Sequence, residues 1–286
     1  MRRIRGMEVA NKMNARMQEE LQSWDGPVPK LAIVRVGERP DDLAYERGAC
    51  KRMEKIGLRC EVSAFPETIT AEDFAKSFAQ INADPDVNGI LLLRPLPKHL
   101  KEERIITQID PAKDLDGISP VNMAKLYQGD PTGFAPCTAE AVVEILKYAE
   151  IDLTGKNVAI IGRSLVIGKP LAQLMLQENA TVTTVHTRTR NPQEICKRAD
   201  IVVAAAGKAR MVDASYIGQD AIVLDVGINY DEKEQKLCGD VDLESLEGIA
   251  SMGTPVPGGV GSVTTSVLAS HLMRAAKQQK TKRNLE

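Results

Sequence analysis

Apolar runs rich in Val, Ile and Ala alternate with stretches of helical periodicity from Leu31 almost to the C-terminus. Strands that are buried on both faces of a parallel sheet have this composition, and helices connect one such strand to the next. The pattern therefore predicts an α/β protein in which βαβ units build largely parallel sheets.

In the first half we expect three strands, at residues 30–36, 60–65 and 89–93. A helix is expected over residues 42–56, because Gly57 suits the left-handed position that ends a helix. Thr70 is expected to cap the next helix. The third strand should end before Pro95, since proline cannot continue a central strand.

In the second half the pattern predicts strands at residues 157–161, 181–185, 201–205 and 221–225, and helices at residues 138–148 and 192–198. A further helix should open near Gly168, where Pro170 suits the first turn. This order of elements is typical of the nucleotide-binding half of a doubly wound fold.

Composition narrows the classes of partner. The chain has 286 residues, enough for two domains, and a net charge of −2, which gives no general attraction to nucleic acid or anionic membranes. No apolar run approaches the ~20 residues that a membrane span needs. The five cysteines are widely spaced, as suits a reducing cytosol, and the three histidines show no metal-site spacing. We therefore expect a cytoplasmic protein without metal, nucleic acid or membrane partners.

A glycine-rich turn, Gly162 to Gly168, follows the predicted strand at 157–161 and precedes a helix. The N-terminus of a helix offers unpaired N–H groups and a positive dipole end, which together suit a pyrophosphate. The spacing of the two glycines meets the dinucleotide pattern G-x-G-x-x-G only in part. By itself the turn is compatible with a phosphate site and with a plain connection.

The end of the following strand favours NADP over NAD. NAD sites place an acidic residue there for the ribose 2′-hydroxyl, whereas this strand ends in His186 without any acid nearby. Arg163, Thr187 and Arg188 are candidate partners for a 2′-phosphate. The alternative is that Arg188 and its neighbour Arg190 are solvated loop charges.

Five short motifs occur in one order. They are Lys113-Asp-Leu-Asp-Gly117, Pro136-Cys-Thr138, the turn Gly162-Arg-Ser with Gly168 and Pro170, Asp225-Val-Gly-Ile-Asn229 and Pro255-Val-Pro-Gly-Gly-Val-Gly261. Together they closely resemble the methylenetetrahydrofolate dehydrogenase/cyclohydrolase family, and the match runs from Val36 to the C-terminal helix.

The resemblance implies two domains with a folate cleft between them, and a homodimer. A catalytic folate-binding domain would span residues 1–139, completed by a last helix at 268–286, and a Rossmann-like NADP-binding domain would span residues 140–267. The family oxidises 5,10-methylenetetrahydrofolate to the methenyl form with NADP, a step of one-carbon metabolism. It commonly hydrolyses the product to 10-formyltetrahydrofolate.

The resemblance also implies site residues. The cofactor would contact Gly162, Arg163, Ser164, Ile167, Gly168, Gly227 and Ile228. Tyr45 and Asp116 are the catalytic and substrate-binding candidates, and a carboxylate at Asp116 can accept from the amino group and ring N–H of a pterin. Folate would also lie beside Pro257, Gly258 and Gly259, where glycine lets backbone approach a ligand. The alternatives are a helix N-cap for Asp116 and a tight turn for the glycine pair.

The sequence departs from the family at two catalytic positions. The family's Tyr-x-x-x-Lys helix places an amine one turn from the phenol, but the lysine position here is Ala49. Lys51 would sit ~200° around the helix from Ala49, and Arg52 shares the Tyr45 face but is a poor general base. The glutamine that supports the lysine in the family is Leu93 here.

Hydride transfer needs the cofactor and the substrate to be held in a near-attack geometry, and it does not need the missing amine. We therefore expect an NADP-dependent methylenetetrahydrofolate dehydrogenase whose cyclohydrolase activity is lost or weak. Three alternatives stay open: the full bifunctional enzyme, a non-catalytic folate or NADP binder, and an NADP oxidoreductase with another substrate. The last is suggested by Asp41, Asp42 and Arg94, which also depart from the family.

Overall fold

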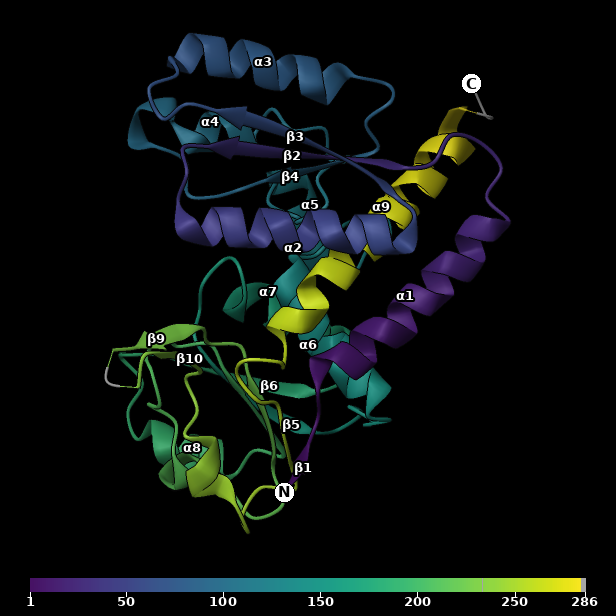
Figure 1. The fold of residues 1–286 in the computed structure, drawn as a ribbon. Helices are drawn as coiled ribbons and strands as arrows, with labels where there is room; N and C mark the ends of the chain where they lie inside the picture. Colours follow the sequence, from purple (N-terminus) through teal and green to yellow (C-terminus); the bar gives the residue numbers. More distant parts are fainter. Residues whose placement is uncertain (233, 284–286) are drawn as a thin grey trace. The chain divides into compact units, whose positions relative to one another are not determined.

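The computed structural model describes residues 1–232 and 234–283 (Figure 1). The chain divides into two compact units, each made of two segments. Unit 1 comprises Met1–Asn11 and Thr138–Thr264, and unit 2 comprises Lys12–Cys137 and Thr265–Glu286. Residues 1–11 thus group with the second half of the chain. The expected domain limits, 1–139 with 268–286 and 140–267, stay a prediction.

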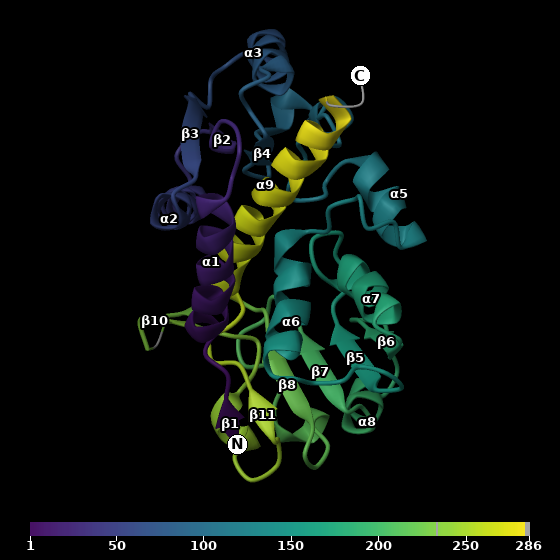
Figure 2. The same ribbon diagram turned by 90° about the vertical axis from the view of Figure 1, so that its right-hand side faces the viewer.

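Unit 1 is built on a six-stranded parallel sheet in the order β1-β11-β8-β7-β5-β6 (Figure 2). Its strands are β1 (Arg2–Arg3), β5 (Asn157–Ile161), β6 (Thr181–Val185), β7 (Ile201–Ala204), β8 (Ile222–Asp225) and β11 (Met252–Gly253). The helices are α6 (Cys137–Tyr148), α7 (Gly168–Gln177) and α8 (Pro192–Lys197). An antiparallel hairpin, β9 (Asn229–Asp231) with β10 (Lys236–Cys238), follows β8.

Unit 2 contains a three-stranded parallel sheet in the order β3-β2-β4. The strands are β2 (Lys30–Val36), β3 (Arg59–Phe65) and β4 (Gly89–Leu92), and the helices between them are α2 (Pro40–Ile56) and α3 (Ala71–Ala83). In Figure 1, α2 and α3 cover opposite faces of this sheet. Phe74 and Phe78 of α3 are fully buried against the side chains of β2 and β4, so this layer forms the core.

Two of the remaining helices are long and two are short. They are α1 (Gly6–Gln22), α4 (Glu102–Ile106), α5 (Pro120–Gln128) and α9 (Gly261–Arg283). The 3₁₀ turns lie at Lys98–Leu100, Ala214–Tyr216 and Leu243–Leu246. Within the described parts of the chain, no helix combines the length and the apolar character that crossing a membrane requires.

The predicted α/β fold is confirmed, and three strands have the predicted bounds. These are β2, β5 and β6. The helix α2 begins at Pro40, two residues before the prediction, because proline tolerates the first helical turn where no N–H partner exists. The prediction missed α1, the short helices α4 and α5, and the short strands β1, β9, β10 and β11, and the last helix begins at Gly261 where residue 268 was expected.

Candidate cofactor and substrate sites

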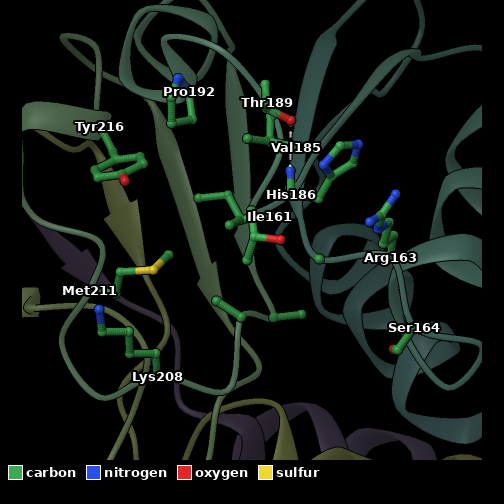
Figure 3. Close-up of a pocket in the computed structure, with 14 residues that line it drawn as sticks. Ile161, Arg163, Ser164, Val185, His186, Thr189, Pro192, Lys208, Met211 and Tyr216 are labelled. Atoms are coloured by element: carbon green, nitrogen blue, oxygen red, sulfur yellow. Dashed lines mark hydrogen bonds between the residues drawn. The ribbon is translucent and has the colours of Figure 1, made fainter.

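A cavity of about 430 Å³ opens where β5, β6 and β7 reach their carboxyl ends, within unit 1 (Figure 3). Open parallel sheets bind ligands at this edge. The cavity is lined by Ile161, Gly162, Arg163, Ser164, Val185, His186, Thr187, Thr189, Pro192, Ala205, Ala206, Lys208, Met211 and Tyr216. The structure thus brings four of the predicted cofactor residues together, namely Gly162, Arg163, Ser164 and Thr187.

Close backbone packing explains both glycines of the turn. Gly162 has a φ of +134°, and a Cβ there would overlap the carbonyl oxygen of Ala205, which follows β7. A Cβ on Gly168 would overlap the carbonyl oxygen of Gly162. The first turn of α7 therefore lies directly against the end of β5, as a phosphate-binding turn requires.

Hydrogen bonds within the turn hold it in shape. The Ser164 hydroxyl accepts from the Ile167 N–H at 3.1 Å, and the Ser164 carbonyl accepts from the Lys169 N–H at 3.0 Å. Arg163 is exposed, and Figure 3 places it on the His186 side of the cavity. Ile167 and Gly168 stand at the start of α7 and do not line the cavity.

The loop after β6 is closed by three hydrogen bonds. The His186 N–H donates to Thr189 Oγ1 at 2.9 Å, and the Thr189 N–H donates to the His186 carbonyl at 2.8 Å. The Arg188 N–H donates to His186 Nδ1 at 3.1 Å, so a neutral His186 carries its proton on Nε2. Thr187 and Arg188 are exposed at the tip of this loop, which contains no acidic residue.

The opposite wall is apolar. Figure 3 shows Pro192, Met211 and Tyr216 on this side, away from Arg163. With Ile161 and Val185 they form a surface suited to a flat aromatic ring, while the Arg163 side is suited to anions. The cavity therefore offers an apolar slot and a cationic rim, the two environments that an adenine nucleotide needs.

A third wall comes from residues that the sequence analysis did not select. Ala205, Ala206 and Lys208 follow β7, and the carboxylate of buried Asp240 accepts from the N–H groups of Ala206, Gly207 and Lys208. The sequence pattern does not give the order of the strands, and only the pairing of β7 with β5 shows that the segment after β7 lies beside the glycine turn that follows β5. Met211 and Tyr216 were missed for the same reason, whereas His186, Thr189 and Pro192 follow β6 near Thr187 and could have been found from that neighbourhood.

The Asp225-Val-Gly-Ile motif ends β8 next to this wall. Asp225 accepts from the N–H groups of Gly227, Asp240 and Val241, and burial raises the pKa of its carboxyl to about 6. A Cβ on Gly227 would overlap the Asp240 carboxylate. Ile228 is exposed. Neither Gly227 nor Ile228 lines the cavity, so their predicted cofactor contacts stay predictions.

In unit 2, Asp116 is tied to the start of α6. Its Oδ1 accepts from the Cys137 N–H at 2.9 Å, and burial raises the pKa of the carboxyl. The N-cap of the following helix α5 is Ser119, which accepts from the Asn122 N–H at 3.2 Å. Asp116 is therefore not the cap of the helix that follows it in sequence.

A buried histidine of α9 contacts the same segment. His271 Nδ1 lies 2.7 Å from the Leu115 carbonyl oxygen, and its ring packs at 5.2 Å from the ring of Phe134. His271 is 1% exposed. The last helix therefore fixes the backbone that presents Asp116, which explains why residues 265–283 group with unit 2.

The positions that depart from the family are apolar and buried on α2 and after β4. Ala49 is 0% exposed and Leu93 is 6% exposed. Lys51 is exposed, whereas Arg52 is half-buried and donates from Nε to Thr265 Oγ1 at 3.1 Å. No amine thus takes the place of the missing lysine on the Ala49 face among these helix residues. Tyr45 is half-buried on the same helix.

The other altered residues are paired locally. Arg94 forms an ion pair with Glu102 at 2.6 Å, and Arg39 lies 3.5 Å from buried Asp42. The Glu102 carboxylate also accepts from the Leu96 N–H at 2.7 Å. These charges are therefore engaged in holding the loops after β2 and β4, which accounts for Asp42 and Arg94 without a changed substrate.

The glycine pair at 258–259 forms a tight loop in unit 1. Gly258 has a φ of +100°, and its carbonyl accepts from the Gly6 N–H at 2.8 Å. A Cβ on Gly259 would overlap the carbonyl oxygen of Pro255. The turn alternative is thus sufficient to explain both glycines, and the substrate contact of Pro257, Gly258 and Gly259 stays a prediction.

Side chains that could bind a metal ion are dispersed. Over residues 1–232 and 234–283, no cluster of three or more His, Cys, Asp or Glu side chains is placed to hold a metal ion.

Two family models match this chain along most of its length. The catalytic domain of tetrahydrofolate dehydrogenase/cyclohydrolase matches residues 4–116, and the NAD(P)-binding domain of the same family matches residues 136–280. The bifunctional protein FolD of Clostridioides difficile (strain 630) is 51% identical over 281 residues, covering 98% of each chain.

Solved structures agree in fold. The bifunctional FolD dehydrogenase/cyclohydrolase of Campylobacter jejuni superposes with a TM-score of 0.92 at 35% identity, covering 96% of this chain and 97% of that one. The Trypanosoma brucei dehydrogenase-cyclohydrolase, solved with NADP cofactor and an inhibitor, gives a TM-score of 0.90 at 33% identity, again covering 96% and 97%.

Proposed function

The chain belongs to the tetrahydrofolate dehydrogenase/cyclohydrolase family, and we propose that it is an NADP-dependent methylenetetrahydrofolate dehydrogenase with little or no cyclohydrolase activity. One observation carries the second part of the proposal. The positions of the family's lysine and glutamine are held by Ala49 and Leu93, both buried and neither able to move a proton.

The cavity of unit 1 supports NADP as the cofactor. The first turn of α7 would hold the pyrophosphate, the wall of Pro192, Met211 and Tyr216 would hold the adenine ring, and the cationic rim would hold the 2′-phosphate. Arg163 and Thr187 line the cavity at that rim, and Arg188, which is exposed at the tip of the loop after β6 and does not line the cavity, would reach the 2′-phosphate from beside them. Bound NADP supplies the hydride acceptor for oxidation of the substrate's methylene carbon.

Asp116 supports folate as the substrate class. A carboxylate can accept two parallel hydrogen bonds from a pterin, and the Cys137 N–H already orients one of its oxygens. We propose that Tyr45 and the loop of Pro257, Gly258 and Gly259 contribute the remaining substrate contacts. We also propose a cytoplasmic homodimer, and sedimentation of the purified protein would test the dimer.

The two activities of the family place different demands on side chains. Hydride transfer requires that cofactor and substrate be held in a near-attack geometry. Attack of water on the methenyl carbon requires a group that takes up a proton near neutral pH. Arg52, which shares the Tyr45 face of the helix, stays protonated and donates a hydrogen bond to Thr265.

The test follows both reactions with purified protein. NADPH and methenyltetrahydrofolate should form from 5,10-methylenetetrahydrofolate, whereas methenyltetrahydrofolate should convert to the 10-formyl form at the uncatalysed rate. Hydrolysis well above that rate would reject the proposed loss. Absence of NADPH formation would reject the dehydrogenase and leave a non-catalytic binder.

The full bifunctional enzyme is the second candidate, since the relative that is 51% identical is named a bifunctional protein. The same hydrolysis assay decides between the two. An Asp116→Ala variant separates both from an oxidoreductase with another substrate, because unchanged tetrahydrofolate affinity in that variant would argue against a pterin at Asp116.

A further inference from the structure

Asp240 directs its carboxylate at three successive backbone N–H groups of the segment Ala206–Lys208. Oδ2 accepts from Ala206 at 2.6 Å and from Gly207 at 2.9 Å, and Oδ1 accepts from Lys208 at 2.9 Å. Oδ1 also accepts from the Asn229 side-chain amide at 2.9 Å. Four donors therefore converge on one carboxylate.

Successive N–H groups that point to one spot form a concave anion-binding nest. Here the protein fills the nest with its own carboxylate, from a residue that is 0% exposed. Hydrogen bonds to an ionised acceptor are roughly twice as strong as neutral ones. Asp240 is thus a fixed buried anion, and the backbone dipoles of the segment Ala206–Lys208 compensate its charge.

Asp240 is itself held in place by its backbone. Its N–H donates to Asp225 Oδ1 at 3.0 Å, and its carbonyl accepts from the Val212 N–H at 2.9 Å. Gly227 approaches the carboxylate so closely that any Cβ would collide with it. The anion therefore has little freedom to move, and the segment bonded to it is fixed to the end of β8.

The fixed segment is a wall of the cofactor cavity. Ala205, Ala206 and Lys208 line the cavity, but the N–H groups of residues 206–208 turn towards Asp240. They are consequently not donors for a bound phosphate. Phosphate recognition is left to the glycine turn and the cationic rim, and the segment contributes shape and the Lys208 side chain.

We propose that Asp240 is a positioning residue for the cofactor, which sets the wall Ala206–Lys208 without touching the nucleotide. This inference rests on the proposed NADP site. If the nest is emptied, its three N–H groups lose their acceptor and the segment loses its anchor, so nucleotide affinity should fall while the folate side is unaffected.

The experiment measures the NADP dissociation constant by calorimetry for the full-length protein and its Asp240→Asn and Asp240→Gly variants. Loss of charged hydrogen bonds predicts binding weakened by roughly tenfold to a hundredfold. The KM for 5,10-methylenetetrahydrofolate should stay close to that of the unsubstituted protein. Asp152→Asn is the matched control, because Asp152 accepts from the Thr154 N–H in the same unit, and neither residue lines the cavity.

Chemical rescue separates positioning from general damage. Formate should enter the space left in Asp240→Gly and restore most of the NADP affinity, whereas formamide, which has the same shape without the charge, should not. Sodium chloride at the same ionic strength controls for screening. Equal effects of formate and formamide would overturn the role of the carboxylate.

A milder variant guards against misfolding of the Asp240 variants. Asn229→Ala removes only one of the four donors from a half-buried position, and it should weaken NADP binding about threefold to tenfold. If the unsubstituted protein binds no NADP, the proposed cofactor is wrong. If it binds NADP and neither the Asp240 variants nor Asn229→Ala changes the affinity, the positioning role is wrong.

Discussion

At the scale of single residues, function depends on which side chains reach the ligand and which only shape the backbone. Arg163 is a cation on the rim of the cavity, whereas Gly162 beside it contributes only the absence of a Cβ. Ala49 and Leu93 illustrate the reverse case, in which buried apolar atoms replace a family's proton-transfer groups. Arg163 therefore bears on the choice between NADP and NAD, whereas Ala49 and Leu93 bear on whether the methenyl product can be hydrolysed.

The rim residue should distinguish NADP from NAD. Arg163→Ala removes a charged hydrogen-bond donor from the 2′-phosphate, so the KM for NADP should rise about 10- to 100-fold. The KM for NAD, which lacks that phosphate, should change little. Steady-state kinetics with both cofactors measures the ratio.

Arg190→Ala serves as the control, since Arg190 is exposed in the same region but does not line the cavity. It should leave both constants near those of the unsubstituted protein. An equal rise in KM for NADP and NAD on Arg163→Ala would place Arg163 at the pyrophosphate instead.

The sequence indicates only those site residues that are neighbours along the chain. The glycine turn, Arg163 and the acid-free strand end at Thr187 could be found because each adjoins a recognisable strand. Lys208 and Tyr216 could not, because they reach the cavity through the order of strands in the sheet. Asp240 was still less accessible, since its role depends on where three backbone N–H groups point.

At the scale of elements, buried parallel strands are the most predictable part of this protein. The uninterrupted apolar runs of β2 and β5 fix their bounds, since both faces are covered. The helix α1 was missed because its buried face includes Asn14, which breaks the apolar periodicity. The hairpin β9–β10 has only three residues in each strand, too few for a pattern.

The junction between β5 and α7 depends on a residue without a side chain. Gly162→Ala would place a Cβ against the Ala205 carbonyl at a φ that L-residues rarely adopt. Backbone strain and overpacking together should destabilise unit 1 by about 2–5 kcal/mol and abolish measurable NADP binding. Urea unfolding and calorimetric titration would measure the two effects.

Gly155→Ala provides the comparison for strain alone. Gly155 has a φ of +72°, but a Cβ added there would meet no atom within 4 Å, so only the backbone cost of about 1–2 kcal/mol applies. NADP affinity should be retained. Similar losses in both variants would mean that strain, and not contact with Ala205, makes Gly162 necessary.

At the scale of the whole molecule, each compact unit is assembled from segments far apart in the sequence. Unit 1 recruits residues 1–11 through the pairing of β1 with β11. Unit 2 recruits residues from 265 onward, where Gln279 of α9 donates to the Asn88 and Ala112 carbonyls. Hydrophobic patterns locate the strands and helices, but they carry no information about such distant pairings, so the grouping of residues 1–11 with unit 1 could not be expected from them.

This division predicts that core damage stays local to a unit. Leu272→Ala in α9 and Leu224→Ala in β8 delete the same side chain from sites that are both 0% exposed, and each should cost about 2–5 kcal/mol. Trp24, the single tryptophan, lies in unit 2, where its fluorescence reports unfolding of that unit. Hydrogen exchange of β5 and β7 reports on unit 1.

Leu272→Ala should therefore lower the urea midpoint seen by Trp24 and leave exchange in β5 and β7 almost unchanged. Leu224→Ala should do the opposite, and added NADP should offset its loss, because a ligand stabilises the unit that binds it. The physical reason is that Leu272 lies in unit 2 and Leu224 in unit 1, and a cavity created by truncation weakens the packing around it. If both variants shift both readouts equally, the chain unfolds as one cooperative body, and the division into two units describes contacts but not stability.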